Sequence, residues 1–294
     1  MKTLGTHHSK AELAAALGVS ASGFHAHQHK PKRPRRGQDA QLSKLIAECF
    51  ARSRGTYGSP RLRHDLLALG QRCGKNRIGR LMRQQGLRAR QKRRFRPRTT
   101  DSDHRHPPAP NWLAKVPAPD RPSQIWQSDI TYLDTQEGWL YLAFTLDACT
   151  RRCVAHHTSE ELAADLVTTT FAQAIARVRP PPGLIHHSDR GIQYAAAAFG
   201  QRLTAHGVTA SMSRTANPYD NALAESFVAT LKAECFADRL PPTKAAAKLM
   251  VFDYIETFYN PRRRHSSLGY LSPLEFEMQM FPQKHPKQTH PLTK

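Results

Sequence analysis

The sequence predicts a mixed α/β domain preceded by a basic, all-helical region and a proline-rich linker. Residues 1–100 carry 24 Lys and Arg against four Asp and Glu, whereas residues 101–294 carry 20 against 19. Apolar residues in the first third recur every three or four positions, as on one face of a helix. From residue 123 onward, runs rich in Ile, Thr, Tyr, Val and Phe alternate with segments of helical spacing, which is typical of an α/β sheet.

Length and composition exclude several classes of protein. A chain of 294 residues is long enough for two or three domains, and 39% hydrophobic residues argues against a wholly disordered protein. No apolar run approaches the roughly 18 residues that span a bilayer, and no secretory leader is recognisable. The five cysteines form no CxxC pair, so we expect reduced thiols in a soluble, intracellular protein without a membrane partner.

The first two predicted domains are helical. Residues 1–37 contain a capping box at Ser9 and Glu12, a Gly18 that can end the first helix, and a basic linker, which together predict a helix-turn-helix and its tail. Residues 38–96 predict a second helix-turn-helix domain with helices near 40–52, 60–69 and 75–85, the last two ended by Gly70 and Gly86.

The charge excess in this region predicts double-stranded DNA as a partner. Apolar spacing leaves a basic face, and a basic run follows the third helix; the candidate DNA-binding residues here are Arg61, Arg63, Lys75, Arg77, Arg80, Arg93 and Arg94. The alternative is a solvated basic surface with no ligand.

Residues 97–122 predict a proline-rich linker, pinned by Asn111, Trp112 and Leu113. Residues 123–260 then read as three strands, a helix, a strand, a helix, a strand and two helices near 219–237 and 243–259. We expect Trp126 and Trp139 to be core aromatics. Residues 261–294 form a basic extension in which Arg262, Arg263 and Arg264 are candidate contacts to the DNA backbone.

Three acids stand out by their placement. Asp129 lies inside an apolar strand, where a carboxylate is costly unless it binds a cation or hydrogen-bond donors. Asp189 follows the apolar run LIHH at the end of a strand, where α/β folds place ligands. On the helix that follows, Glu225 shares the face opposite the apolar residues with Asn221 and Lys232. Any one of these acids alone is more commonly an exposed surface residue.

Three carboxylates brought together by a sheet and a helix suit Mg²⁺, with Mn²⁺ as a substitute. Two such ions would activate a hydroxyl nucleophile and stabilise the leaving oxygen of a phosphodiester. Basic DNA-binding domains ahead of such a site favour phosphoryl transfer on DNA.

Three motifs carry a family resemblance: WQSDITY, HSDRGIQY and SMSRTANPYDNALAESFVATLKAE, with 35 residues between Asp189 and Glu225. They resemble the catalytic core of the DDE transposases and retroviral integrases. The chain is most similar to the second-frame (OrfB) protein of two-frame bacterial insertion sequences. The likeness extends from GVSASGFHA and YGSPRLRHDL to YNPRRRHSSLGYLSPLEF, which is nearly the whole chain.

The resemblance implies an RNase H-like fold with Asp129, Asp189 and Glu225 as the catalytic, metal-binding triad. It implies a polynucleotidyl transferase that cleaves and joins DNA at the ends of its own element. The resemblance also implies that Lys232 contacts the terminal DNA, that the chain forms a homo-oligomer on DNA in a cytoplasmic, nucleoid-associated bacterial setting, and that an upstream first-frame protein is a fusion or association partner. Asn221, on the same helix face as Glu225 and Lys232, is a further candidate DNA contact.

The sequence departs from these families in two places. The early histidines and Cys49 and Cys73 lack the spacing of an integrase zinc domain, so no zinc is expected. Thr215 and Ala216 stand where relatives usually carry a basic and a small residue, which weakens one expected phosphate contact. Two other functions stay open: a DNA-binding transcriptional regulator, which has no use for the triad, and a nuclease of the same fold that uses water as its nucleophile.

Overall fold

The computed structural model describes residues 9–20, 22–23, 35–90, 108–214, 217–236 and 240–282. Its centre is a five-stranded mixed sheet with the order β3-β2-β1-β4-β5. Strands β1 (Ile125–Thr135), β2 (Gly138–Asp147) and β3 (Cys153–Ser159) form an antiparallel meander. Strands β4 (Ile185–Ser188) and β5 (Thr209–Met212) run parallel to β1. The mixed sheet predicted from the sequence is therefore present.

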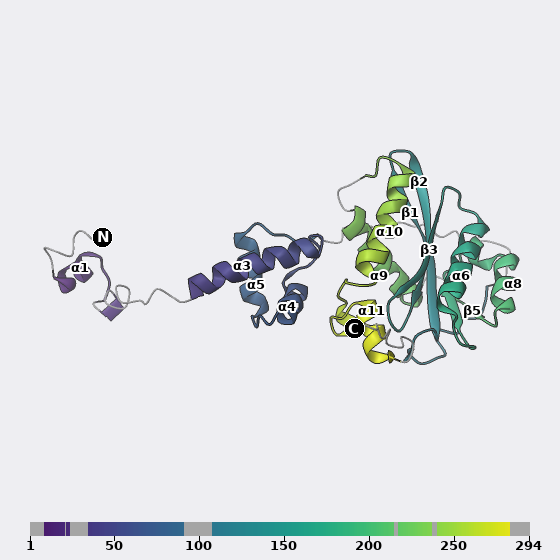
Figure 1. Ribbon diagram of the computed structural model, residues 1–294, viewed down its shortest axis with the longest axis horizontal. Coiled ribbons are helices and arrows are strands. Elements are labelled where there is room, and N and C mark those ends of the chain that lie inside the picture. The colour runs from purple at the N-terminus through teal and green to yellow at the C-terminus, as the bar shows by residue number, and fades with distance from the viewer. Residues whose placement is uncertain are drawn as a thin grey trace, which may run out of the picture.

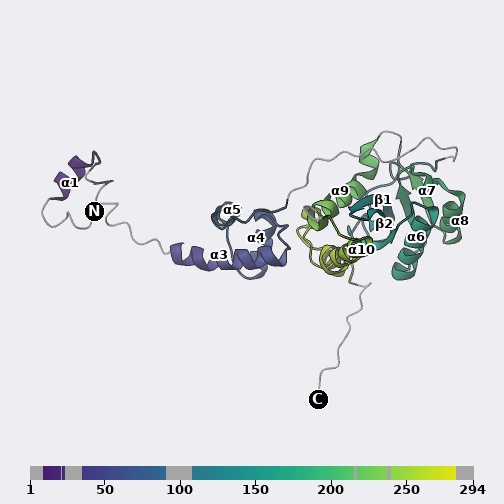
Figure 2. The same cartoon turned by 90° about the horizontal axis from the view of Figure 1, so that it is seen from above.

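Helices cover both faces of this sheet (Figure 1). Helices α6 (Ala164–Val178), α7 (Ile192–Ala195) and α8 (Ala197–Ala205) lie on one face. Helices α9 (Ala222–Leu231) and α10 (Lys244–Phe252) lie on the other, as the view from above also shows (Figure 2). Each face therefore has its own buried core.

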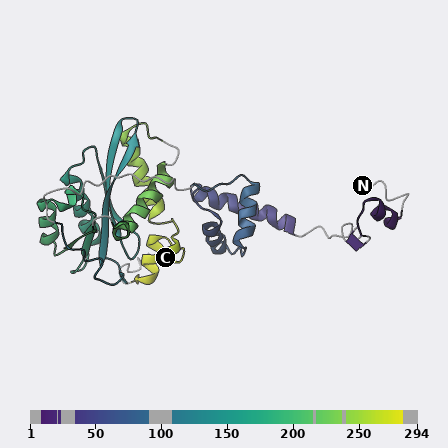
Figure 3. The ribbon, with the colours of Figure 1, turned by 180° about the vertical axis from the view of Figure 1, so that it is seen from behind.

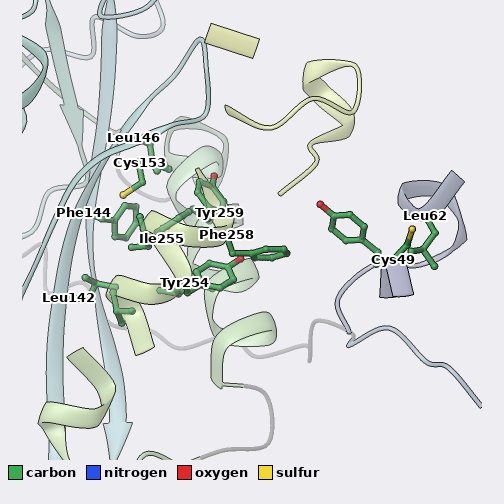
Figure 4. Packing of buried hydrophobic residues seen from close by; sticks show 14 of the residues in the cluster. Cys49, Leu62, Leu142, Phe144, Leu146, Cys153, Tyr254, Ile255, Phe258 and Tyr259 are labelled. Carbon is green, nitrogen blue, oxygen red and sulfur yellow. The ribbon is translucent and has the colours of Figure 1, made fainter. Parts of the chain in front are cut away.

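The core on the α9 and α10 side is aromatic. Figure 4 shows Phe144 on the sheet facing Ile255 and Tyr259, while the Phe258 ring is directed away from the sheet, toward Tyr57 of the helical domain. The Phe227 ring of α9 lies 4.6 Å from the ring of Phe144. Since Phe144 is fully buried on β2, this contact fixes α9 over the centre of the sheet.

Both long helices on this face end in wider turns. The α9 helix continues as a π-helical segment, Lys232–Phe236, and α10 continues as another, Asp253–Tyr259. A short 3₁₀ turn, Pro218–Asn221, precedes α9. The sequence predicted two uninterrupted helices here, because helical spacing does not distinguish α from π turns over a few residues.

The basic helical domain consists of α3 (Arg35–Arg52), α4 (Ser59–Ala68) and α5 (Lys75–Gln84). Leu62, Leu66 and Ile78 are fully buried between them, and Gly70 and Gly86 take positive φ after α4 and α5, as predicted. This domain lies on the α9 and α10 side of the sheet, which the reverse view shows as well (Figure 3).

Polar contacts join the helical domain to the core. Arg54 donates two hydrogen bonds to Asp253, at 2.6 and 3.2 Å, and Arg264 pairs with Asp65. The Tyr57 hydroxyl accepts a hydrogen bond from the Arg264 backbone N–H at 2.6 Å.

Three further helical segments lie within the described residues. They are α1 (Lys10–Ala16), which starts at the predicted Ser9 capping box, the 3₁₀ turn Ser266–Leu268, and α11 (Pro273–Met280).

Two sequence expectations about the core have different outcomes. Trp126 is fully buried, whereas Trp139 is 54% exposed at the start of β2 and contacts only the edge of Tyr132 among the ring pairs of the described residues. Our prediction for Trp139 was wrong because its side chain lies on the face of β2 opposite to the fully buried Leu140, and it stays exposed there. Across the described residues, no helix is long and apolar enough to cross a bilayer.

Candidate active site

Asp129 lies on the face of β1 that α9 covers. Its neighbour Ser128 points to the opposite face, where its hydroxyl lies 2.8 Å from His186 Nε2. Asp129 pairs across the sheet with Phe144, the residue that packs on α9. Because side chains alternate along a strand, the Asp129 carboxylate is directed toward α9. It accepts the Ile130 N–H at 2.9 Å.

Asp189 follows the last residue of β4, the strand parallel to β1. Their register pairs Trp126 with His186 and Gln127 with His187. Continued by two residues, that register places Asp189 beside Asp129, on neighbouring strands about 4.8 Å apart. The Asp189 Oδ1 atom accepts the Gly191 N–H at 3.0 Å. A Cβ atom at Gly191 would lie 3.1 Å from the same oxygen, so a larger residue in this turn would require the Asp189 side chain to shift.

Glu225 comes from the first turn of α9, and its side chain is exposed. The opposite side of the helix is anchored in the core by Ala224, Phe227 and Leu231, which are at most 2% exposed. The amphipathic pattern predicted from the sequence is thus present, and it leaves Glu225 directed away from the hydrophobic core.

The three carboxylates influence one another electrostatically. Burial raises the pKa of Asp129 well above its ordinary value, and repulsion from Asp189 and then Glu225 raises it further. Burial also raises the pKa of the Tyr194 hydroxyl, with the same two aspartates adding to the shift. Negative charge is therefore concentrated between β1, β4 and α9.

This donor set fits a divalent cation of the Mg²⁺ type. All three groups are oxygen donors, and a cation between them would relieve the repulsion that raises the Asp129 pKa. Within the described ranges, no three His, Cys, Asp or Glu side chains already form a coordinating group. The buried Asn221 Oδ1, at the start of α9, meets no hydrogen-bond donor among the described residues, as expected of an atom left for solvent or a ligand.

Lys232 lies two α-helical turns after Glu225 and is half-buried. Burial lowers the pKa of its ammonium group, and the nearby Asp129 carboxylate opposes that shift. The lysine is therefore part of the same charged group as the triad. Asn221 is more buried than we expected for a DNA contact, with only 8% of its surface exposed.

Comparisons with known proteins decide the family. An integrase core domain model matches residues 119–218, a second integrase core domain model matches residues 206–273, and an HTH-like domain model matches residues 38–95. The chain is 42% identical over 265 residues to an uncharacterized 31 kDa protein of insertion element IS600 from Shigella sonnei, covering 90% of this chain and 97% of that protein. It is 36% identical to the transposase InsF of insertion sequence IS3A from Escherichia coli, covering 90% and 92%.

The chain belongs to the DDE insertion-sequence transposases. Its mixed sheet is the RNase H-like fold of that family. A simian T-cell lymphotropic virus intasome structure also aligns, with 16% identity, a TM-score of 0.46 and coverage of 79% of this chain and 73% of that one.

Two histidines before Asp189 support the site of the transposase from below. His186 packs edge-on against Phe171, at 5.8 Å, and His187 lies 2.9 and 3.1 Å from the hydroxyls of Ser211 and Ser213. Burial lowers their pKa values to about 3 and about 4, so both rings are neutral at pH 7. Both rings therefore serve to hold β4 in the sheet and not to donate charge to the site.

A buried carboxylate also holds the loop that leads into α9. Asp220 accepts hydrogen bonds from the Arg214 backbone at 2.9 Å and from Asn111 at 2.8 Å. Ser211 accepts the Trp112 N–H at 2.9 Å. The predicted pinning of the linker is therefore confirmed. The sequence analysis missed Asp220, although its PYDN turn directly before a helix is a recognisable signal.

The predicted DNA-binding residues of the helical domain differ in their exposure and in their partners. Arg63, Lys75 and Arg80 are exposed on α4 and α5. Arg77 and Arg80 both bind Asp39, at 2.7 Å. Arg61 is partly buried, lies over the Tyr57 ring and reaches within 4.0 Å of Glu234. The predictions for Arg93, Arg94, Thr215 and Ala216 lie outside the described residues.

The C-terminal arginines correct part of our prediction. Arg262 is exposed, as a DNA contact requires. Arg263 is only 4% exposed and binds Glu234 through two hydrogen bonds, while Arg264 binds Asp65 and the Tyr270 carbonyl. These two guanidinium groups are used inside the transposase, because a carboxylate on another segment reaches each of them. A charge run alone does not reveal such partners.

Proposed function

We propose that Asp129, Asp189 and Glu225 bind Mg²⁺ at the centre of the reaction that this transposase catalyses, with Mn²⁺ able to substitute. The family performs DNA cleavage and strand transfer. The observation that carries the proposal is the register of β1 with β4, which sets Asp129 beside Asp189 on the face of the sheet covered by the helix that carries Glu225; burial and the two neighbouring carboxylates also raise the pKa of Asp129. Carboxyl groups with strongly raised pKa values cluster at functional sites, and a cation bound here would offset the negative charge of Asp129.

Bound Mg²⁺ supplies a Lewis acid that activates a hydroxyl and stabilises the leaving oxygen of a phosphodiester. The protein supplies the rest. The paired strands hold the two aspartates in register, α9 presents Glu225 from above, and Lys232 offers an ammonium group for a phosphate of the terminal DNA. We propose that a 3′-hydroxyl at the element's end is the nucleophile in joining.

Duplex DNA is the partner that we propose for the exposed basic side chains of α4 and α5 and for Arg262. A homo-oligomer assembled on DNA, with an upstream first-frame protein as a further partner, completes the proposal. Sedimentation of the purified chain on element-end DNA tests the assembly: one chain per DNA end, with full joining activity, would contradict it.

The triad is tested by Asp129→Asn, Asp189→Asn and Glu225→Gln. Each keeps the shape of the side chain and removes the charge that holds the cation, so we expect joining to fall at least 1,000-fold while end-DNA binding changes less than about threefold. Asp134→Asn, on an exposed position of the same strand as Asp129, is the matched control and should join normally. Strand transfer by purified Asp189→Asn at the wild-type rate would refute the proposal.

A further inference from the structure

A buried carboxylate outside the triad lies where three parts of the chain meet. Glu234, in the π-helical segment after α9, is 7% exposed. Arg263 donates to its two oxygens at 2.7 and 2.6 Å, and the Tyr254 hydroxyl donates at 2.8 Å. The Glu234 backbone carbonyl also accepts a hydrogen bond from Arg90, at 2.7 Å. The catalytic helix, the C-terminal segment and the end of the helical domain are thus joined at one residue.

Stability alone does not explain this arrangement. Two buried ions lose their hydration, and a well-packed apolar pair is often as stable as a buried salt bridge. The ion pair adds a fixed relative orientation of the two segments, because a bidentate arginine–carboxylate contact holds both partners in one geometry. Removing one partner would leave the other charge buried and unpaired.

The position of Glu234 shows which part of the helix this fixed geometry would hold. Lys232, two residues earlier, begins the π-helical segment, and such turns are rare and short in proteins. Tertiary contacts therefore have to hold this turn. Glu234 provides them through both its side chain and its carbonyl, two residues after Lys232 in the same segment.

We propose that Glu234 is a positioning residue that sets the place of the Lys232 ammonium beside the triad, with Arg263 and Tyr254 as its anchors. This inference rests on the proposed function of Lys232. Glu234 touches neither DNA nor the reacting atoms; it acts through the helix end that carries the lysine.

The test uses the full-length transposase with a labelled element end. Glu234→Gln keeps the size of the side chain and removes its charge, and we expect joining to fall about tenfold with end-DNA binding within twofold of wild type. The matched control is Glu277→Gln. Glu277 is 4% exposed on α11, away from the catalytic helix, and it binds Arg152 at 3.0 Å. The control should join within twofold of wild type.

A double-mutant cycle separates positioning from general destabilisation. If Glu234 acts through Lys232, the double variant Lys232→Ala/Glu234→Gln joins no more slowly than Lys232→Ala alone. Multiplying effects would overturn the inference, as would equal losses in Glu234→Gln and Glu277→Gln that follow their melting temperatures. Wild-type joining by Lys232→Ala would instead remove the lysine from the proposed function, and the inference with it. Should Glu234→Gln not fold, Arg263→Lys serves in the same cycle, because lysine cannot reproduce the two-pronged contact.

Discussion

At the scale of single residues, the active site gathers like charges that the fold by itself would avoid. Asp129 is the clearest case, since its carboxylate is both desolvated and repelled by Asp189 and Glu225. Such groups reduce stability in the absence of a ligand and are retained for function.

Asp129→Asn should therefore not destabilise the protein in EDTA at pH 7, and its melting temperature should equal or exceed that of wild type. Wild-type carboxylates repel one another without a cation, whereas the amide carries no charge. Added Mg²⁺ should raise the melting temperature of wild type and not of the variant. Differential scanning fluorimetry measures both, and a variant stabilised by Mg²⁺ as much as wild type would place the cation elsewhere.

Lys232 provides a second prediction at this scale. Lys232→Ala should reduce joining at least tenfold and weaken engagement of the terminal nucleotides, whereas Lys232→Arg should be milder because a cation remains. Crosslinking from position 232 to a labelled DNA end measures the contact directly. Capture of internal DNA only, with unimpaired joining by Lys232→Ala, would show that the lysine has no part in end binding.

Residue patterns singled out the three acids of the proposed triad but not the buried contacts around them. Asp129, Asp189 and Glu225 were recognisable because each acid follows or interrupts an apolar pattern locally. Glu234 and Arg263 lie 29 positions apart and look like ordinary surface charges until the fold pairs them. Tertiary pairing of this kind has no local sequence signal, which is why Arg263 was assigned to DNA.

At the scale of elements, the edge strand β3 is covered by three polar side chains, His156, Glu256 and Arg177, which we call the charged clamp. β3 is an edge strand, and its His156 lies 3.3 Å from Glu256 on the π-helical segment after α10. Arg177 of α6 donates two hydrogen bonds to the same carboxylate at 2.8 Å. Helices from opposite faces thus meet across β3, which protects the strand from pairing with another chain.

The clamp gives a pH prediction. Hydrogen bonds from Arg177 and then His156 lower the pKa of Glu256 to about 2. A lowered pKa stabilises the fold at pH values above the ordinary glutamate pKa, and this stabilisation is lost as the pH falls toward the folded value. Glu256→Gln should cost about 1 kcal/mol at pH 7, since Arg177 is 41% exposed and solvent screens the pair. Urea unfolding should show this difference shrinking between pH 4.5 and 2; a difference independent of pH would exclude the ion pair as its cause.

The order of elements was predictable from the sequence, but two of their details were not. Alternating apolar runs gave the strands, and glycines marked the helix ends. The π turns that begin at Lys232 and Asp253 contact each other through Glu234 and Tyr254, which lie 20 positions apart, so no window of a few residues contains both.

At the scale of the whole molecule, the basic domain is docked on the catalytic core through its own arginines. Arg54 binds Asp253, and the rings of His64 and Tyr270 stack at 3.9 Å. These contacts take some basic groups away from DNA and leave others, including Arg63 and Lys75, exposed.

The salt dependence of duplex DNA binding by the full chain should consequently come from the exposed basic side chains only. Arg63→Ala and Lys75→Ala should each reduce the slope of log affinity against log salt by about 0.9, the value for one phosphate contact. Arg77→Ala should change the slope less, because Asp39 holds that guanidinium. Fluorescence anisotropy across a salt series provides the measurement, and equal slopes for all variants would move the DNA-binding face elsewhere.

The pairing of Glu234 with Arg263 also bears on the order in which the protein is synthesised. The ribosome makes all three acids of the triad before it reaches Arg263, so a nascent chain can hold every catalytic side chain while Glu234 still lacks its guanidinium. A chain that stops before residue 263 would have the catalytic residues but a poorly held helix end. The arrangement therefore makes the place of the Lys232 ammonium depend on a segment that is translated after the catalytic helix and has to fold back onto it.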